Sequence, residues 1–116
     1  MNTSDSLYTI NSIPEENKIV ISGELKLQTV AKYNEIIEIL LDSCITLKDP
    51  VILDIRNLTI LNSSGIASFG LFIIKMRDIS KKLIIHASKH IHWQVFSLED
   101  FKELDSNLEI EFFEMH

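Results

Sequence analysis

Ile60-Leu-Asn-Ser-Ser-Gly-Ile66 is the stretch that decides how this 116-residue chain folds. It follows an apolar run, Val51–Ile55, and it precedes a run with helical spacing of apolar residues that extends to about Ser80. The first pattern predicts a strand covered on at least one face, and the second predicts a helix that begins at Ser63 or Ser64. Asn, Ser and Gly at such a junction are also residues that cap helices. The stretch therefore predicts a strand that passes into a helix.

Further strands and helices are predicted on both sides of this junction. The strand patterns cover Tyr8–Ile13, Lys18–Ser22, Lys82–His86 and Asn107–Glu114. Apolar residues in steps of three and four predict an amphipathic helix over residues 29–47, with Thr29 as its N-cap.

A last helix is predicted from the capping-box pattern at residues 97–100 through Leu104, while Gly23–Leu27 is predicted to be a loop. The resulting order is β-β-α-β-α-β-α-β. It predicts an α/β fold with a mixed, largely parallel sheet and crossover helices.

The length and composition indicate one domain spanning residues 1–116, with a polar start, residues 1–6, that we expect to be mobile. Neither a membrane-spanning run nor a secretory signal is recognisable. The single cysteine, Cys44, excludes an internal disulfide, fits a cytoplasmic location and is expected to be a buried apolar residue.

The net charge of −6 argues against nucleic acid and against an anionic membrane as the main partner. Nucleic-acid binding needs a basic face, and the Lys and Arg residues of this chain are scattered. A protein partner or a small ligand remains.

Two interpretations of the turn formed by Asn62, Ser63, Ser64 and Gly65 follow from its residue types. One is purely structural, because Asn and Ser are strong helix caps. The other is functional, because a helix N-terminus offers unpaired N–H groups and the positive end of a dipole, which favour phosphate. The residues alone leave both interpretations open.

A strand ending in Leu-Asp-Ile, followed by a short link and by Leu-Asn-Ser-Ser-Gly-Ile at the start of an apolar helix, resembles a STAS domain, the domain of sulfate transporters and anti-sigma-factor antagonists. The order of elements from about residue 8 to 114 is also similar. The later segments Phe72–Arg77 and Ile91–Gln94 look like a branch of standalone bacterial STAS regulators. Bacterial antagonists typically carry Asp-Ser-Ser-Gly or Asp-Ser-Ala-Gly, so this chain departs from the family at Asn62.

The resemblance implies a non-enzymatic partner-switching protein, similar to an anti-anti-sigma factor, with Ser63 as the phosphorylated residue and Ser64 as the second choice. It implies two partners, a serine kinase of the histidine-kinase ATPase fold and a metal-dependent serine phosphatase. The partner-binding surface would include the turn from Asn62 to Gly65. Asn62 could alter kinase recognition or abolish phosphorylation.

The helix after the turn also suggests a docking surface. At 100° per residue, Ile66, Phe69 and Ile73 share a core face, whereas Phe72 falls toward the other side. One interpretation is a helix covered on two sides, and the other is an exposed apolar patch in which Phe72 contacts the partner.

No catalytic arrangement, cofactor motif or metal site is predicted. His90 and His92 have no neighbouring ligand residues, and Trp93 is interpreted as a core anchor rather than a stacking platform. Asp54, at the predicted end of a central strand, is interpreted as a capping or solubilising carboxylate more readily than as a ligand group. Two alternatives to the switch stay open, namely a sensor of a nucleotide or other small anion and a constitutive scaffold.

Overall fold

The computed structural model describes residues 2–4 and 7–114 of the chain. Its strands form one six-stranded sheet in which spatial order equals chain order. The strands are β1 (Asn2–Ser4), β2 (Tyr8–Ile13), β3 (Lys18–Leu25), β4 (Val51–Leu61), β5 (Leu83–Ser88) and β6 (Glu109–Phe113). β1, β2 and β3 pair in antiparallel fashion, whereas β3 to β6 are parallel. The predicted fold class, α/β with a mixed and largely parallel sheet, is confirmed.

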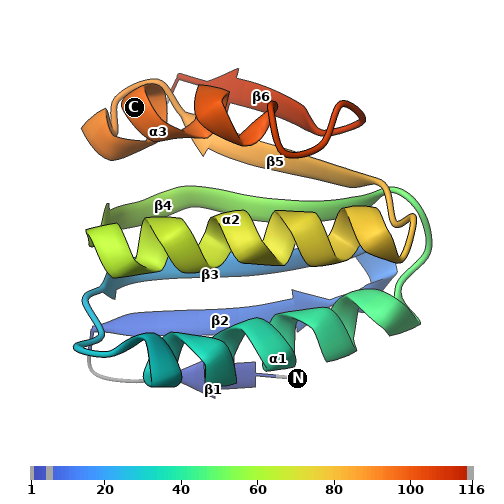
Figure 1. The fold of residues 1–116 in the computed structure, drawn as a ribbon, viewed down its shortest axis with the longest axis horizontal. Helices are drawn as coiled ribbons and strands as arrows, with labels where there is room; N and C mark the ends of the chain where they lie inside the picture. Colours follow the sequence, from blue (N-terminus) through green and yellow to red (C-terminus); the bar gives the residue numbers. More distant parts are fainter. Residues whose placement is uncertain (1, 5–6, 115–116) are drawn as a thin grey trace.

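Each parallel connection contains one helix: α1 (Val30–Thr46), α2 (Ser63–Asp78) or α3 (His92–Phe101). A short 3₁₀ turn, η1 (Pro14–Glu16), joins β2 to β3. Figure 1 shows α1 and α2 side by side across one face of the sheet, with α3 next to α2 at the β5–β6 end. The helix N-termini therefore gather at the carboxyl ends of the parallel strands.

The core lies between the helices and one face of the sheet. Alternate residues of β4 and β5, such as Leu53 and Ile85, are buried against the helices. Thr29 caps α1 as predicted, since its Oγ1 accepts a hydrogen bond from the Lys32 N–H at 3.2 Å. None of the helices in residues 2–4 and 7–114 is long and apolar enough to cross a bilayer.

Two strands extend beyond their predicted bounds. β4 continues to Leu61 instead of ending at Ile55, and β3 continues through Gly23 to Leu25. The pairing of β3 with β4 shifts register after Val20 and after Gly23. Such shifts interrupt the regular alternation of buried and exposed residues, which is why the sequence pattern did not show the full length of either strand. Consequently Asp54 lies inside β4 and not at its end.

The N-terminus was expected to be mobile, but Asn2–Ser4 pair with β2 as an edge strand. A polar segment can form an edge strand because pairing depends on backbone groups and one strand face remains in water. The same expectation for residues 1, 5 and 6 lies outside the described residues.

The last helix was predicted to begin at Ser97, and this is wrong because α3 begins at His92. The buried residues Gln94, Leu98 and Phe101 follow steps of four and three, but the exposed Val95 and Phe96 hide that stripe in the sequence. The buried Gln94 side chain donates to the Ile55 and Leu58 carbonyls and accepts from the Ser88 N–H. Trp93 also anchors this helix, donating from Nε1 to the Leu58 carbonyl at 3.0 Å.

Of the two interpretations of this helix, the exposed patch at Phe72 is wrong, because the Phe72 side chain is 0% exposed, and the helix covered on two sides is confirmed. Helix α2 is covered on two sides, with α1 packed along it and α3 against it at Gly70. A helix enclosed in this way buries apolar residues outside a single stripe. Phe72 therefore belongs to the core, and the exposed apolar residue beside it is Leu71.

Candidate functional site

The junction between β4 and α2 is capped by Asn62, as the sequence predicted for this turn. Asn62 has extended backbone angles (φ −76°, ψ 173°), and its Oδ1 accepts a hydrogen bond from the Gly65 N–H at 3.0 Å. Its backbone carbonyl accepts from the Ile66 N–H at 2.9 Å, which starts the helix. This geometry fixes where the chain turns from strand to helix.

The cap itself is held by Tyr33 from α1 and by the loop between β3 and α1. The Tyr33 hydroxyl lies 2.5 Å from Asn62 Oδ1 and 3.2 Å from the Leu25 carbonyl, and it accepts from the Leu27 N–H. Asn62 Nδ2 donates to the Leu27 carbonyl at 2.9 Å. Burial raises the pKa of Tyr33, so the hydroxyl remains a proton donor at neutral pH. One tyrosine thus joins α1, β3 and the β4–α2 junction.

Gly65 permits this close packing. A Cβ atom at Gly65 would lie 2.4 Å from Leu61 Cδ1 and 2.7 Å from the Tyr33 hydroxyl. Both distances are far inside van der Waals contact, so a side chain would displace Tyr33 or the helix.

Asn62 stands where the Asp-Ser-Ser-Gly pattern has an aspartate, and its amide makes a hydrogen bond that a carboxylate cannot make. A carboxylate could accept from the Gly65 N–H and from Tyr33, but it has no N–H to donate to the Leu27 carbonyl. In this chain position 62 therefore uses a donor as well as an acceptor.

Ser63 and Ser64 differ in accessibility although they are adjacent. Ser63 is the first residue of α2 and is exposed, and its hydroxyl bonds to no other described residue. Ser64 is half-buried, and its carbonyl accepts from Ser68 Oγ at 2.8 Å. The backbone N–H groups of both serines also bond to no residue within the described ranges.

Exposed apolar side chains occur on several elements at the same edge of the sheet as this turn. Val30 starts α1, Ile60 lies near the end of β4, and Phe96, which is 69% exposed, lies in the second turn of α3. In Figure 1 the start of α1, the end of β4 and helix α3 lie along the left side of the molecule, with α2 between α1 and α3. Single exposed apolar residues are common on protein surfaces, so these three mark an edge that a partner could span and do not form one continuous patch.

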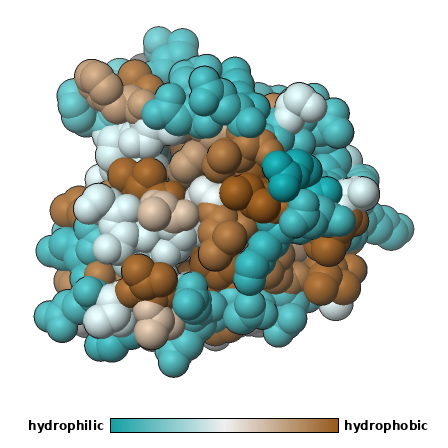
Figure 2. Space-filling model, in the orientation of Figure 1, coloured by the Kyte–Doolittle hydropathy of each residue, from teal (hydrophilic) through white to brown (hydrophobic). Residues whose placement is uncertain are grey.

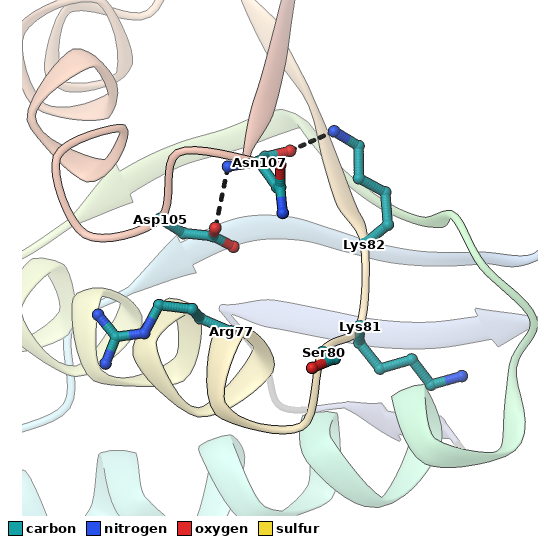
Figure 3. Close-up of a pocket in the computed structure, with 6 residues that line it drawn as sticks. All are labelled: Arg77, Ser80, Lys81, Lys82, Asp105 and Asn107. Atoms are coloured by element: carbon teal, nitrogen blue, oxygen red, sulfur yellow. Dashed lines mark hydrogen bonds between the residues drawn. The ribbon is translucent and has the colours of Figure 1, made fainter.

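A cationic hollow at the other end of α2 does not form an anion site. It is lined by Arg77, Lys81 and Lys82, together with Asp105, but Figure 3 shows the three cationic side chains pointing apart. Each is already engaged: Arg77 donates to the Leu104 carbonyl, Lys81 to the Leu47 carbonyl and Lys82 to the Asn107 carbonyl. No convergent positive charge is left for a phosphate.

Asp54 lies on the face of the sheet opposite the helices and is committed to ion pairs. Arg56 binds its carboxylate in bidentate fashion at 3.0 and 2.8 Å, and Lys18 Nζ lies 3.9 Å from Oδ2. Burial alone would raise the pKa of Asp54, but the hydrogen bonds and charge of Arg56 outweigh it and lower the pKa. Asp54 is therefore a structural carboxylate.

The remaining candidate groups have structural surroundings. Cys44 is buried, as predicted, and burial raises the pKa of its thiol to about 12. No cluster of three His, Cys, Asp or Glu side chains able to hold a metal ion occurs among residues 2–4 and 7–114.

No protein-family model matches this sequence, and a comparison with curated proteins finds no match either. Solved structures do match in fold. A chain in the crystal structure of the diguanylate cyclase SiaD in complex with its activator SiaC, from Pseudomonas aeruginosa, superposes with a TM-score of 0.70 at 14% identity over 99% of both chains. The apo-SiaC structure from the same organism superposes with a TM-score of 0.64 at 14% identity over 94% of this chain and 93% of that one.

The chain folds like SiaC. At this level of identity the likeness concerns the fold, and it agrees with the mixed sheet and the single-sided helices described above. In the first of these structures, SiaC is bound to SiaD as its activator.

The sequence identified the turn but missed the residues that hold it. In the sequence, Tyr33 is one of the apolar residues of the helix predicted over residues 29–47, and Leu27 ends the predicted loop, so neither indicates a contact with the turn. A tyrosine within a core stripe is one available signal, since a buried tyrosine hydroxyl needs a hydrogen-bond partner.

Proposed function

We propose that this chain is a non-enzymatic protein-interaction switch of the STAS type, in which phosphorylation of Ser63 releases a partner protein. The observation that supports it most is a contrast within one helical turn. Tyr33 and Leu61 hold Asn62 and Gly65 in place, whereas the Ser63 hydroxyl between them is exposed and unbonded among the described residues. A kinase can reach this hydroxyl without unfolding α2.

Phosphate at Ser63 would leave the fold of this chain intact and would weaken the binding of a partner protein. A phosphoserine adds roughly −1.5 to −2 charges at neutral pH, and the unpaired N–H groups of the first turn and the helix dipole favour such a charge. A partner packed over the neighbouring apolar side chains would bury it without a counter-ion, which costs several kcal/mol. Ser64 is the second choice because it is half-buried.

The resemblance to STAS regulators supplies the proposed partners. We propose a serine kinase of the histidine-kinase ATPase fold and a metal-dependent serine phosphatase, in the cytoplasm of a bacterium. The fold likeness to SiaC, an activator of a diguanylate cyclase, makes a signalling enzyme a further candidate partner.

The test compares partner capture by Ser63→Ala, Ser63→Asp and the matched control Ser64→Ala from extracts of cells that produce the protein. We expect Ser63→Ala and Ser64→Ala to capture the same partner as the wild type and Ser63→Asp to lose it. Mass spectrometry of the native protein should find phosphate on Ser63.

Two other results would support the alternatives. Equal capture by all variants, with no phosphate on either serine, would indicate a constitutive scaffold. Saturable binding of inorganic phosphate or a nucleotide, with amide shifts at Ser63 and Ser64 in NMR spectra, would indicate a small-anion sensor.

A further inference from the structure

We infer that a groove between α2 and α3 binds an amphipathic helix of a partner protein that carries a basic residue on its flank. The groove has a volume of about 410 Å³ and is open to solvent. Its walls are Ile66, Leu71 and Ile74 on one side and Asp100, Phe101 and Leu104 on the other. Figure 2 shows hydrophobic side chains gathered in the middle of this face, over α2 and toward α3. The inference rests on the proposed function only in taking a protein as the partner.

Because Gly70 has no side chain, Leu104 and Phe101 can pack closely against α2 at the floor of the groove. A Cβ atom there would lie 3.3 Å from Leu104 Cδ1 and 3.7 Å from Phe101 Cε1. The segment after α3 therefore closes over α2 at Gly70, and the apolar side chains on either side stand above that contact.

The shape and chemistry of the groove fit a helix better than an extended peptide. On α2 the lining residues Ala67, Gly70, Leu71 and Ile74 follow the i, i+3, i+4, i+7 spacing of one helical stripe. The backbone groups in the middle of a helix are already bonded within it, so an extended peptide would find no ladder to join. A helix with a complementary apolar stripe needs no such backbone partners.

The charge at the rim indicates a basic flank on that helix. Asp100 is exposed, and its carboxylate pairs with no cation in the described part of the chain, whereas the neighbouring Glu99 pairs with Lys102 at 3.4 Å. A Lys or Arg facing Asp100 would therefore gain an ion pair without breaking one. A second copy of this chain fits less well, because each copy has a net charge of −6 and a two-fold contact would bring two unpaired Asp100 carboxylates into one interface.

The test uses NMR titration of the ¹⁵N-labelled protein with two synthetic helical peptides. Both peptides carry the same leucine stripe, and they differ only in a flank of lysines or glutamates. We expect the lysine peptide to shift the amides of Ala67, Gly70 and Ile74 and to bind at least tenfold more tightly than the glutamate peptide. Asp100→Asn should remove most of that preference.

Leu71→Lys and Ile79→Lys form a matched pair of variants, since both residues lie at exposed positions on or next to α2 (42% and 47%) and only Leu71 lines the groove. Leu71→Lys should weaken binding of the lysine peptide at least tenfold, and Ile79→Lys should leave the affinity for that peptide unchanged. Absent shifts, shifts outside the groove, or equal binding of both peptides would overturn the inference.

Concentration-dependent shifts at the same amides without peptide would assign the groove to a second copy and also overturn the inference. The experiment does not involve Ser63. Peptide binding in the groove together with unchanged partner capture by Ser63→Asp would refute the switch and leave the groove assignment standing.

Discussion

The two ends of helix α2 complete their hydrogen bonds in different ways. At the C-terminal end, the Ile79, Ser80 and Lys81 N–H groups return to carbonyls of the last turn. Arg77 ties that end to the Leu104 carbonyl. At the N-terminal end, the Gly65 N–H alone receives a side-chain cap from a described residue, Asn62.

The difference indicates which end is available for binding. At the C-terminal end the backbone hydrogen bonds are completed within the protein. The three cations that line the hollow there, Arg77, Lys81 and Lys82, each already donate to a backbone carbonyl. At the N-terminal end, Tyr33 holds Asn62 in place from the protein interior, whereas the Ser63 side chain is exposed to solvent. A rigid support under an exposed polar group is the arrangement that the proposed switch at Ser63 requires.

Phe72→Ala should remove the support that both ends share and have the largest effect. Phe72 is fully buried, so its truncation should lower the free energy of unfolding by about 3–5 kcal/mol. Urea denaturation followed by circular dichroism measures this. The matched control Leu71→Ala, at an exposed position, should cost roughly 1 kcal/mol or less. Equal losses for the two variants would contradict the buried position of Phe72.

Gly65→Ala should disturb the N-terminal end alone. The added Cβ would overlap Leu61 and Tyr33, so we expect a loss of roughly 1–3 kcal/mol and a changed near-ultraviolet signal from the tyrosine. Gly70→Ala is the control, because its nearest neighbour, at 3.3 Å, is the end of a leucine side chain that can move. A more severe effect at Gly70 than at Gly65 would argue against the tight packing of the cap.

Asn62→Asp tests whether the amide is required. The variant keeps an acceptor for the Gly65 N–H but loses the donor to the Leu27 carbonyl, so it should lower stability by about 1 kcal/mol. Asn62→Ala, which loses the cap as well, should cost more. Thermal melts of the two variants decide the order, and a stabilising Asn62→Asp would show that the amide has no local role.

Ser80→Gly tests the closed end. Ser80 has a φ of 57°, in the left-handed region that favours glycine, so the substitution should raise the free energy of unfolding by up to about 1 kcal/mol. Ser80→Ala, which cannot relieve this conformation, should give no gain. The same denaturation assay compares them, and a stabilising Ser80→Ala would point to another cause.

Ser63→Ala should have the smallest effect on stability, within about 0.5 kcal/mol, because the hydroxyl supports no described contact. A differential scanning calorimetry trace that overlays that of the wild type would sharpen the contrast with Gly65→Ala, two residues away. A loss above 1 kcal/mol would mean that Ser63 has a structural role.

The regular parts of the fold could be predicted from the sequence because they obey one periodicity each. The α1 stripe and the apolar run at Val51–Ile55 are examples. The start of α3 could not be predicted, since the exposed Phe96 conceals the stripe of Gln94 and Leu98. Periodicity alone also cannot show whether a helix has two covered sides, which is why the sequence left both interpretations of Phe72 open.

The candidate site was predicted in part. A cap formed by the Asn62–Gly65 turn and a helix that begins at Ser63 follow from residue preferences at a strand-to-helix junction. The bond from Tyr33 could not be predicted, because 29 positions separate it from Asn62 and only the packing of α1 beside β3 brings them together. Local rules describe a cap, whereas its support is a tertiary contact.

The agreement between chain order and strand order in the sheet has a consequence for how the protein is made. Each strand pairs with the strand that precedes it, so no pairing waits for a distant segment to be synthesised. Loop closure costs less for near neighbours, and domains begin to fold from their N-terminus during translation. The sheet can therefore grow on the ribosome one strand–helix unit at a time, and the capped turn that carries Ser63 is in place as soon as α2 has left the exit tunnel and packed on α1.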